Sequence, residues 1–335
     1  MKKSLVICGV AALALASCTQ SEVLDVPESR AINFNAFVNK NTRAVTALTN
    51  LTTDFYVIGY HTQTSGGDWS SPSDAFKNEP ASTLYYWQPE DTYRFGAYAD
   101  GSNGKIDNAE FDASTSTLTF DAYTPDDAKD LIAAVSGDES GALTGSTGSY
   151  SHNPVSLTFK HMLSQVKFTI STEAAAVYKL TISELNIDAI NKGNGTYTSA
   201  AGASWDVSSF TESKGYSYTA LANGGVISKD VPTSDVKLVL PQSNDGLKVT
   251  FKATIAGEKP SGQTTTEKTF EATLTYDHDS NGKKWMPGFC YNYTANVNIE
   301  DIIDNPDDLV KIVFTPSVDS WQEKDVPALN PTEKP

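Results

Sequence analysis

Residues 31–38 alternate between apolar and polar side chains, which is the period-2 pattern of a half-buried strand. The apolar positions on one face are Ile32, Phe34, Ala36 and Val38. A polar, turn-prone stretch follows and ends at Arg43. Two interpretations fit this pattern. The segment is either a permanent first strand or a strand that is removed when the chain is cut after Arg43.

The chain contains only three arginines, Arg30, Arg43 and Arg94, and the first two flank this strand. An arginine-specific protease therefore has few other sites. Each buried Ile, Phe or Val side chain contributes roughly 1.5–3 kcal/mol, so removal of the strand has a large effect. The groove left behind would carry unpaired strand edges, and it would aggregate unless another strand filled it.

Short apolar or alternating segments continue along the whole chain, and turns rich in Gly, Asn and Ser separate them. The strands predicted in the first half are 55–60, 93–98, a hairpin over 110–123, 130–135 and 155–163. Those predicted in the second half are 166–170, 179–190, 236–240, 247–255, 269–276, 291–299 and 309–314. Residues 61–78 are predicted to form a loop, and 192–195 a turn. No amphipathic helix pattern occurs, so the chain is predicted to be all-β and built from antiparallel β-sandwiches.

The apolar face changes from odd to even positions between Leu163 and Val166. A slip of one residue reverses every side chain of a strand, so one continuous flat strand cannot carry this pattern. A bulge, or passage into another sheet, can. We therefore predict a domain boundary here, between an N-terminal sandwich over 44–160 and a C-terminal sandwich over 161–335.

Residues 1–17 have the pattern of an export signal. Two lysines precede an apolar run, 5–15, that is too short to span a bilayer as a stable helix. The run ends in Leu-Ala-Ser-Cys, which resembles the bacterial lipobox. In that motif the cysteine, here Cys18, is acylated with fatty acids such as palmitate and becomes the first residue of the mature protein. Residues 18–43 then form a lipid-anchored propeptide that carries the removable strand.

The composition narrows the possible functions. The formal net charge is −16, and such an acidic chain repels nucleic acid, so nucleic-acid binding is excluded. With Cys8 removed and Cys18 acylated, Cys290 is alone, and no internal disulfide is expected.

No constellation of catalytic residues emerges, so the protein is not expected to be an enzyme, and no cofactor is expected. The four histidines are scattered, and the lone His161 on an apolar strand face favours a structural role. Residues 277–282 match the opening of a calcium loop, but Gly288 stands where the bidentate glutamate belongs. A hairpin turn is therefore favoured there, and no metal site is predicted.

Four local patterns in this order resemble the fimbrillin family of type V pilus proteins from Gram-negative anaerobes. They are the lipobox with the alternating strand and Thr42-Arg43-Ala44, Tyr85-Tyr86-Trp87 with Phe95-Gly96-Ala97-Tyr98, residues 157–166, and residues 285–293 with Val318-Asp319-Ser320-Trp321. The resemblance implies two tandem transthyretin-like β-sandwiches. It also implies export as a lipoprotein to the outer membrane, with Cys18 as the lipidation site, and cleavage after Arg43 at the cell surface.

The resemblance further implies a pilus subunit that acts in adhesion. The implied partners are other pilus subunits, the lipid bilayer and a surface ligand. Other subunits are partners because a neighbour's C-terminal segment fills the vacated groove. The chain departs from stalk-type members at 322–335, where three prolines weaken any strand. Either 309–318 serves as the donor, or the protein is a tip or accessory subunit. The alternative function is a glycan-binding outer-membrane lipoprotein that never polymerises, with Trp69 in a predicted exposed loop as the candidate contact.

Overall fold

The computed structural model describes most of the chain between residues 30 and 320. The described residues are 30–40, 47–50, 54–63, 68–101, 104–126, 129–140, 142–144, 149–151, 154–171, 178–218, 226–227, 233–259, 262–274, 283–296 and 315–320. The predicted sites Cys18 and Arg43 lie outside these ranges, as do the calcium-like loop and the C-terminal tail. Among the described residues, no helix has the length and apolar character needed to cross a membrane.

The described residues form β-strands almost throughout, which confirms the all-β prediction. The strands of the first half are β1 (Phe34–Lys40), β2 (Ala47–Asn50), β3 (Tyr56–Thr62), β4 (Ser73–Pro80), β5 (Thr92–Asp100), β6 (Ala109–Asp112), β7 (Thr117–Tyr123), β8 (Leu131–Val135), β9 (Glu139–Ser140), β10 (Ala142–Thr144), β11 (Ser149–Ser151) and β12 (Val155–His161). Those of the second half are β13 (Ser164–Ser171), β14 (Tyr178–Ile190), β15 (Gly193–Thr198), β16 (Gly202–Asp206), β17 (Ser213–Ser217), β18 (Val226–Ile227), β19 (Lys237–Val239), β20 (Leu247–Lys259), β21 (Gly262–Leu274), β22 (Phe289–Asn296) and β23 (Thr315–Ser320).

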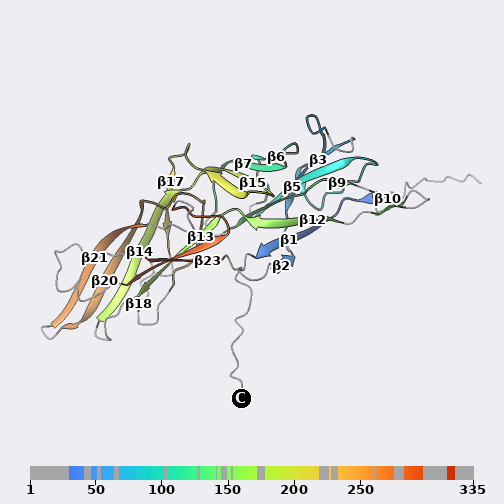
Figure 1. Ribbon diagram of the computed structural model, residues 1–335. Helices are drawn as coiled ribbons and strands as arrows, with labels where there is room; N and C mark the ends of the chain where they lie inside the picture. Colours follow the sequence, from blue (N-terminus) through green and yellow to red (C-terminus); the bar gives the residue numbers. More distant parts are fainter. Residues whose placement is uncertain are drawn as a thin grey trace, which may run out of the picture.

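The largest sheet has the strand order β2-β1-β12-β8-β5-β3-β4, and β9 pairs with β5 (Figure 1). Its central strands are buried on both faces. In β5, Phe95 belongs to the core on one face, whereas Tyr98 belongs to the core on the other. The second of these cores is shared with a smaller sheet of order β16-β15-β7-β6, which contributes Leu118 and Phe120.

The second half of the chain contains two further sheets, β19-β13-β22-β23 and β17-β14-β20-β21, with β18 paired to β14. One apolar core takes side chains from both sheets, including Phe168 of β13, Tyr291 of β22 and Phe251 of β20. The two sheets therefore pack face to face as a sandwich.

Among the described strands, most pairs are antiparallel, as predicted, but two pairs are parallel. These are β1 with β12 and β13 with β22. Each joins segments more than a hundred residues apart in the sequence. This far exceeds the crossover of about a dozen residues that a parallel pair requires. The alternation within one strand carries no information about the direction of its partner, so the sequence pattern did not reveal these pairs.

The loop predicted over residues 61–78 is wrong in part, because residues 73–80 form β4. β4 is an edge strand, and only Ala75 and Phe76 in it are buried. Two register shifts against β3 interrupt its alternation. A polar, irregular edge strand of this kind discourages edge-to-edge aggregation, and it also hides the period-2 signal.

The turn predicted over residues 192–195 is also wrong, since β15 begins at Gly193. A Cβ atom on Gly195 would lie only 2.8 Å from the ring of Trp205. Glycine is thus needed here because the tryptophan ring lies against the strand.

The change of apolar parity coincides with the break between β12 and β13 at Met162 and Leu163. Both residues are fully buried in the core that the two halves share. The predicted division between 44–160 and 161–335 falls before the last residue of β12, next to this break, and it stays a prediction. β15 of the second half pairs with β7 of the first.

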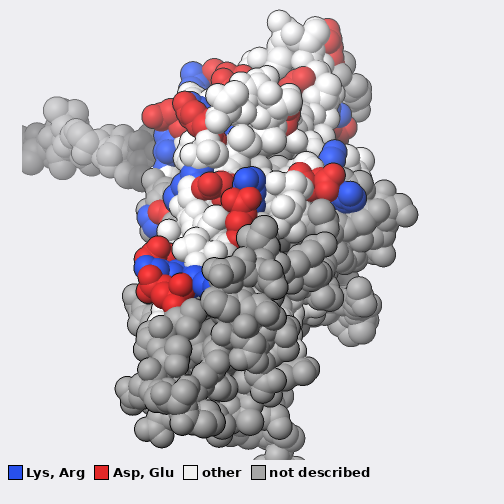
Figure 2. Space-filling view, turned by 90° about the vertical axis from the view of Figure 1, so that its left-hand side faces the viewer, with Lys and Arg blue, Asp and Glu red and all other residues white. Residues whose placement is uncertain are grey.

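The acidic charge is not gathered into one uniform patch on the described part of the face shown in Figure 2, where acidic and basic side chains lie close together. Two exposed pairs across β20 and β21 are typical. Lys248 Nζ lies 2.7 Å from Glu271, and Lys252 Nζ lies 2.8 Å from Glu267. Exposed pairs of this kind contribute at most about 1 kcal/mol each.

Candidate functional site

β1 fills a slot between β12 and the short strand β2 (Figure 1). It runs parallel to β12, with Phe34 opposite Val155 and Val38 opposite Phe159. Among the described strands, β2 pairs only with β1. Removal of β1 would therefore free the edge of β12 and also leave β2 without its partner.

The four apolar side chains named above face the core of the first half. Ile32 and Val38 are 3% exposed, whereas Phe34 and Ala36 are partly buried against the same core. Asn33 and Asn35, at alternate positions, are exposed. One face of β1, together with Ile32 just before it, thus supplies apolar surface to this core.

Phe34 occupies an aromatic pocket under the start of β1. Its ring meets those of Phe55, Phe76 and Phe95 edge-on, with centroids 6.0, 5.5 and 5.3 Å away. Such edge-to-face contacts add about 0.5–1.5 kcal/mol per pair beyond simple burial. The pocket therefore favours an aromatic ring at this position of any strand that fills the slot.

Backbone groups of β1 point alternately to its two sides. The Val155 N–H donates to the Asn33 carbonyl at 2.8 Å, so odd positions face β12. The Ile32 N–H donates to the Tyr85 carbonyl at 2.8 Å, so even positions face away from β12. This alternation decides which residue types the slot accepts.

Two of the three arginines are held inside the fold. The Arg30 guanidinium donates to the Trp87 carbonyl at 3.3 Å, and the Trp87 N–H donates back to the Arg30 carbonyl at 3.0 Å. Arg94 forms an ion pair with Asp138 and donates to the Ala113 carbonyl at 2.6 Å.

His161 and Trp69, the two other residues singled out from the sequence, are both engaged by neighbours. His161 is 5% exposed, and its Nδ1 lies 2.5 Å from the Asp130 carboxylate. Trp69, predicted to lie in an exposed loop, is half-buried, and the Arg94 guanidinium covers one face of its ring at 4.5 Å from the centroid. His161 is the last residue of β12, the strand that pairs with β1, whereas Trp69 lies between β3 and β4 near the opposite edge of the sheet.

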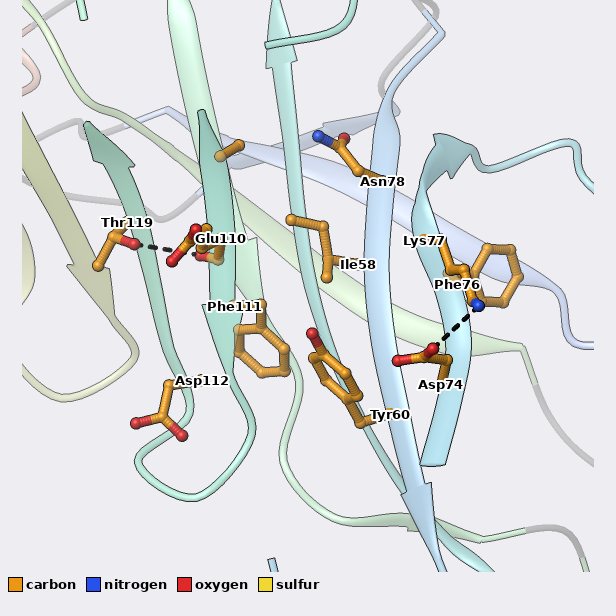
Figure 3. Close-up of a pocket in the computed structure, with 11 residues that line it drawn as sticks. Ile58, Tyr60, Asp74, Phe76, Lys77, Asn78, Glu110, Phe111, Asp112 and Thr119 are labelled. Carbon is orange, nitrogen blue, oxygen red and sulfur yellow. Dashed lines mark hydrogen bonds and ion pairs between the residues drawn. The ribbon is translucent and has the colours of Figure 1, made fainter. Parts of the chain in front are cut away.

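A second concave site, which we call the trough, lies between the free edges of β4 and β6 (Figure 3). It consists of two adjoining hollows of about 540 and 730 Å³ that share Tyr60, Phe111 and Asp112. Trp69 lines the second hollow. Sequence reasoning found only Trp69, because the trough combines strands of two different sheets and no local pattern marks it.

Metal chemistry has no support in the described part of the chain. No group of His, Cys, Asp and Glu side chains there could hold a metal ion. Cys290 is buried and forms no disulfide within the described part of the chain.

One known protein family matches most of the chain. The model of the fimbrillin-like family matches residues 29–321. A search of curated proteins finds no match.

Several solved structures are similar to this chain. One is the fimbrial anchor protein Mfa2 from Porphyromonas gingivalis, with 15% sequence identity and a TM-score of 0.38. The alignment covers 87% of this chain and 98% of that one. A candidate cell adhesion protein from Parabacteroides distasonis has 12% identity and a TM-score of 0.46, with 87% and 96% of the two chains covered. Another, from Bacteroides uniformis, has 15% identity and a TM-score of 0.38, with 88% and 100% covered.

Proposed function

Because the chain belongs to the fimbrillin-like family, we propose that it is a subunit of a surface fimbria that acts in adhesion and polymerises by strand exchange. The observation that carries this proposal is the slot of β1. One short strand near the N-terminus closes an apolar groove between β12 and β2. A strand from a second copy with the same side-chain pattern can take its place.

Export and anchoring come first in the proposed sequence of events. The signal over residues 1–17 directs the chain to the outer membrane, and acylated Cys18 holds it on the cell surface. Each buried methylene of the acyl chains adds about 0.8 kcal/mol to membrane binding, so several chains on one residue anchor it firmly.

Cleavage after Arg43 then releases β1. The contacts of the other two arginines support this choice of site. Arg30 and Arg94 are bound to backbone carbonyls within the fold, and a protease must extend its substrate chain to cut it. Cleavage after Arg30 would also leave β1 attached.

The incoming strand is a segment near the C-terminus of a second copy. The inward positions of β1 and of the residues just before it are Ile32, Phe34, Ala36 and Val38. Residues with the same spacing and order are Ile312, Phe314, Pro316 and Val318. The shared aromatic residue at the second position matches the pocket that holds the Phe34 ring. This segment would lie parallel to β12, as β1 does.

A proline within the donor strand is compatible with this register. Pro316 falls at the position of Ala36, an even position whose backbone points away from β12. Among the described strands, β2 pairs with β1 only from Phe37 onward, so none of them meets the missing N–H. At an odd position, the same proline would remove a hydrogen bond to β12.

Part of the proposed donor is paired within its own chain. Residues 315–320 form β23, an edge strand whose partner is β22. Donation therefore requires release from one neighbouring strand. Alternatively, the protein is a tip or accessory subunit, which accepts a strand from a neighbour and donates none.

The test uses purified full-length Cys18→Ala protein treated with an arginine-specific protease. We expect one cut, after Arg43, followed by a ladder of oligomers in size-exclusion chromatography. Arg43→Lys should remain uncut and monomeric. Phe314→Asp should be cut normally but stay monomeric, because a carboxylate cannot enter the aromatic pocket.

Val313→Asp is the matched control, since this residue faces outward in the proposed register, and its ladder should persist. Cutting at Arg30 or Arg94 instead would contradict the processing site. A clean cut without any ladder would favour the alternative, a glycan-binding lipoprotein that does not polymerise.

A further inference from the structure

We propose that the trough between β4 and β6 is a binding site for a neutral, linear oligosaccharide. This inference does not depend on polymerisation, because the trough lies at the opposite edge of the large sheet from β1. It would provide an adhesive contact on each subunit.

Several aromatic rings line the trough, and two of them, Tyr60 and Trp69, are held in place before any ligand arrives. The Tyr60 ring stacks on Phe111, with centroids 6.4 Å apart and an angle of 20° between the rings. Trp69 is held by the Arg94 guanidinium, which the Asp138 carboxylate fixes in turn. Rigid aromatic surfaces of this kind pack against the C–H faces of sugar rings without a large loss of side-chain entropy.

Two polar groups in the trough remain available for a ligand. Neither the Glu110 carboxylate nor the Tyr60 hydroxyl has a side-chain hydrogen-bond partner among the described residues, and both line the hollow drawn in Figure 3. Burial, followed by the charges of Asp74, Glu110 and Asp112, raises the pKa of Tyr60. The hydroxyl therefore keeps its proton and can donate, while the carboxylate accepts. A sugar ring offers hydroxyl groups that meet both requirements.

The charges in the trough select against ionic ligands. Its carboxylates repel phosphate, sulfate and sialic acid groups. Two of these carboxylates also bind cations only weakly, because they already have partners. Lys77 Nζ lies 3.0 Å from the Asp74 carboxylate, and Asp112 accepts hydrogen bonds from Ser114. A cation already occupies one face of the Trp69 ring.

The shape of the trough favours a chain of sugars. The two hollows adjoin through Tyr60, so successive rings of one ligand could contact Tyr60 and Trp69 in turn. Both hollows lie at the surface between strand edges, where an extended polymer can enter from the side.

The test is calorimetric titration of the full chain with uncharged linear hexasaccharides of glucose, xylose and mannose. We expect one of them to bind with a Kd below about 1 mM. Tyr60→Ala should weaken that binding at least about tenfold, and Trp69→Ala should do the same. Tyr60→Phe keeps the ring and should lose only a few-fold. Glu110→Gln should also lose a few-fold.

Tyr86→Ala is the matched control, since this half-buried tyrosine lies outside the trough, and binding should be unchanged. Thermal melting of every variant separates loss of the site from loss of the fold. Retained affinity in a folded Tyr60→Ala variant would overturn the proposal. Binding of polylysine or of a sulfated glycan in place of every neutral chain would also overturn it.

Discussion

Asp112 closes the turn between β6 and β7. Its Oδ1 accepts hydrogen bonds from the Ser114 N–H at 2.8 Å and from the Ser114 hydroxyl at 2.6 Å, and its Oδ2 accepts one from the Thr115 hydroxyl at 3.0 Å. These bonds, that of the Ser114 hydroxyl foremost, lower the pKa of Asp112. A short polar side chain thus organises the hairpin that forms one wall of the trough.

The first prediction concerns this carboxylate. Asp112→Ala should lower the free energy of unfolding by about 1 kcal/mol at neutral pH. The folded pKa is lower than the unfolded value of about 3.9, so the carboxylate stabilises the fold fully above that pH. The difference between wild type and variant should shrink as the pH falls below about 4, through the folded pKa. Urea denaturation of both proteins at neutral and acidic pH measures this difference in the free energy of unfolding.

The control is Asp107→Ala, since Asp107 is exposed at the start of the same hairpin. That variant should change the free energy of unfolding at neutral pH by less than Asp112→Ala does. A constant difference between wild type and Asp112→Ala down to about pH 2 would contradict the assignment.

At the scale of elements, β15 shows how one strand joins the two halves of the chain within a single sheet. It pairs with β16 on one side and with β7 on the other. Trp205 of β16 lies opposite Gly195, and its indole N–H donates to the Met162 carbonyl at 2.6 Å. The ring thereby covers the strand and contacts the break between β12 and β13.

The second prediction is that Gly195→Ala destabilises the protein by about 1–3 kcal/mol. The added methyl group would lie 2.8 Å from the Trp205 ring, which must move and strain its hydrogen bond. Thermal unfolding, followed by circular dichroism, measures the effect. Gly137→Ala is the control, because no atom lies within 4 Å of a Cβ at that position. Equal melting temperatures for both variants would contradict the prediction.

At the scale of the whole molecule, the two halves share one core. Met162, Leu238 and Leu240 of the region after β12 pack together with Leu118 and Phe120 of the β6–β7 hairpin. The pairing of β7 with β15 adds backbone hydrogen bonds across the same boundary. If the chain is a fimbrial subunit, as proposed, such a joint would hold its two halves in a fixed relation.

The third prediction follows from this shared core. Residues 30–160 expressed alone should be poorly soluble, because the separated piece exposes fully buried side chains such as Leu118 and Phe120. Co-expression with residues 161–335 should restore a soluble complex. Co-purification and circular dichroism measure the outcome. A fragment 30–160 that melts cooperatively at the temperature of the intact chain would show that the halves are independent.

Several features of the molecule depend only on residues close together in the chain, and the sequence therefore sufficed to predict them. In β12 and β13, apolar residues at every second position mark the face that packs against a core. Both strands, and the break near Met162 and Leu163, could therefore be predicted. The hairpin of β6 and β7, with Leu118 and Phe120 inward, followed from the same rule.

Other features required the tertiary structure, because they depend on partners far away in the chain. The polar edge strand β4 needs β3 beside it, and the glycine-rich strand β15 needs the ring of Trp205. The parallel direction of β1 against β12, and the trough between two sheet edges, arise only when distant segments meet. Alternation along one strand records which face is buried, whereas the identity and direction of its neighbours are decided by packing.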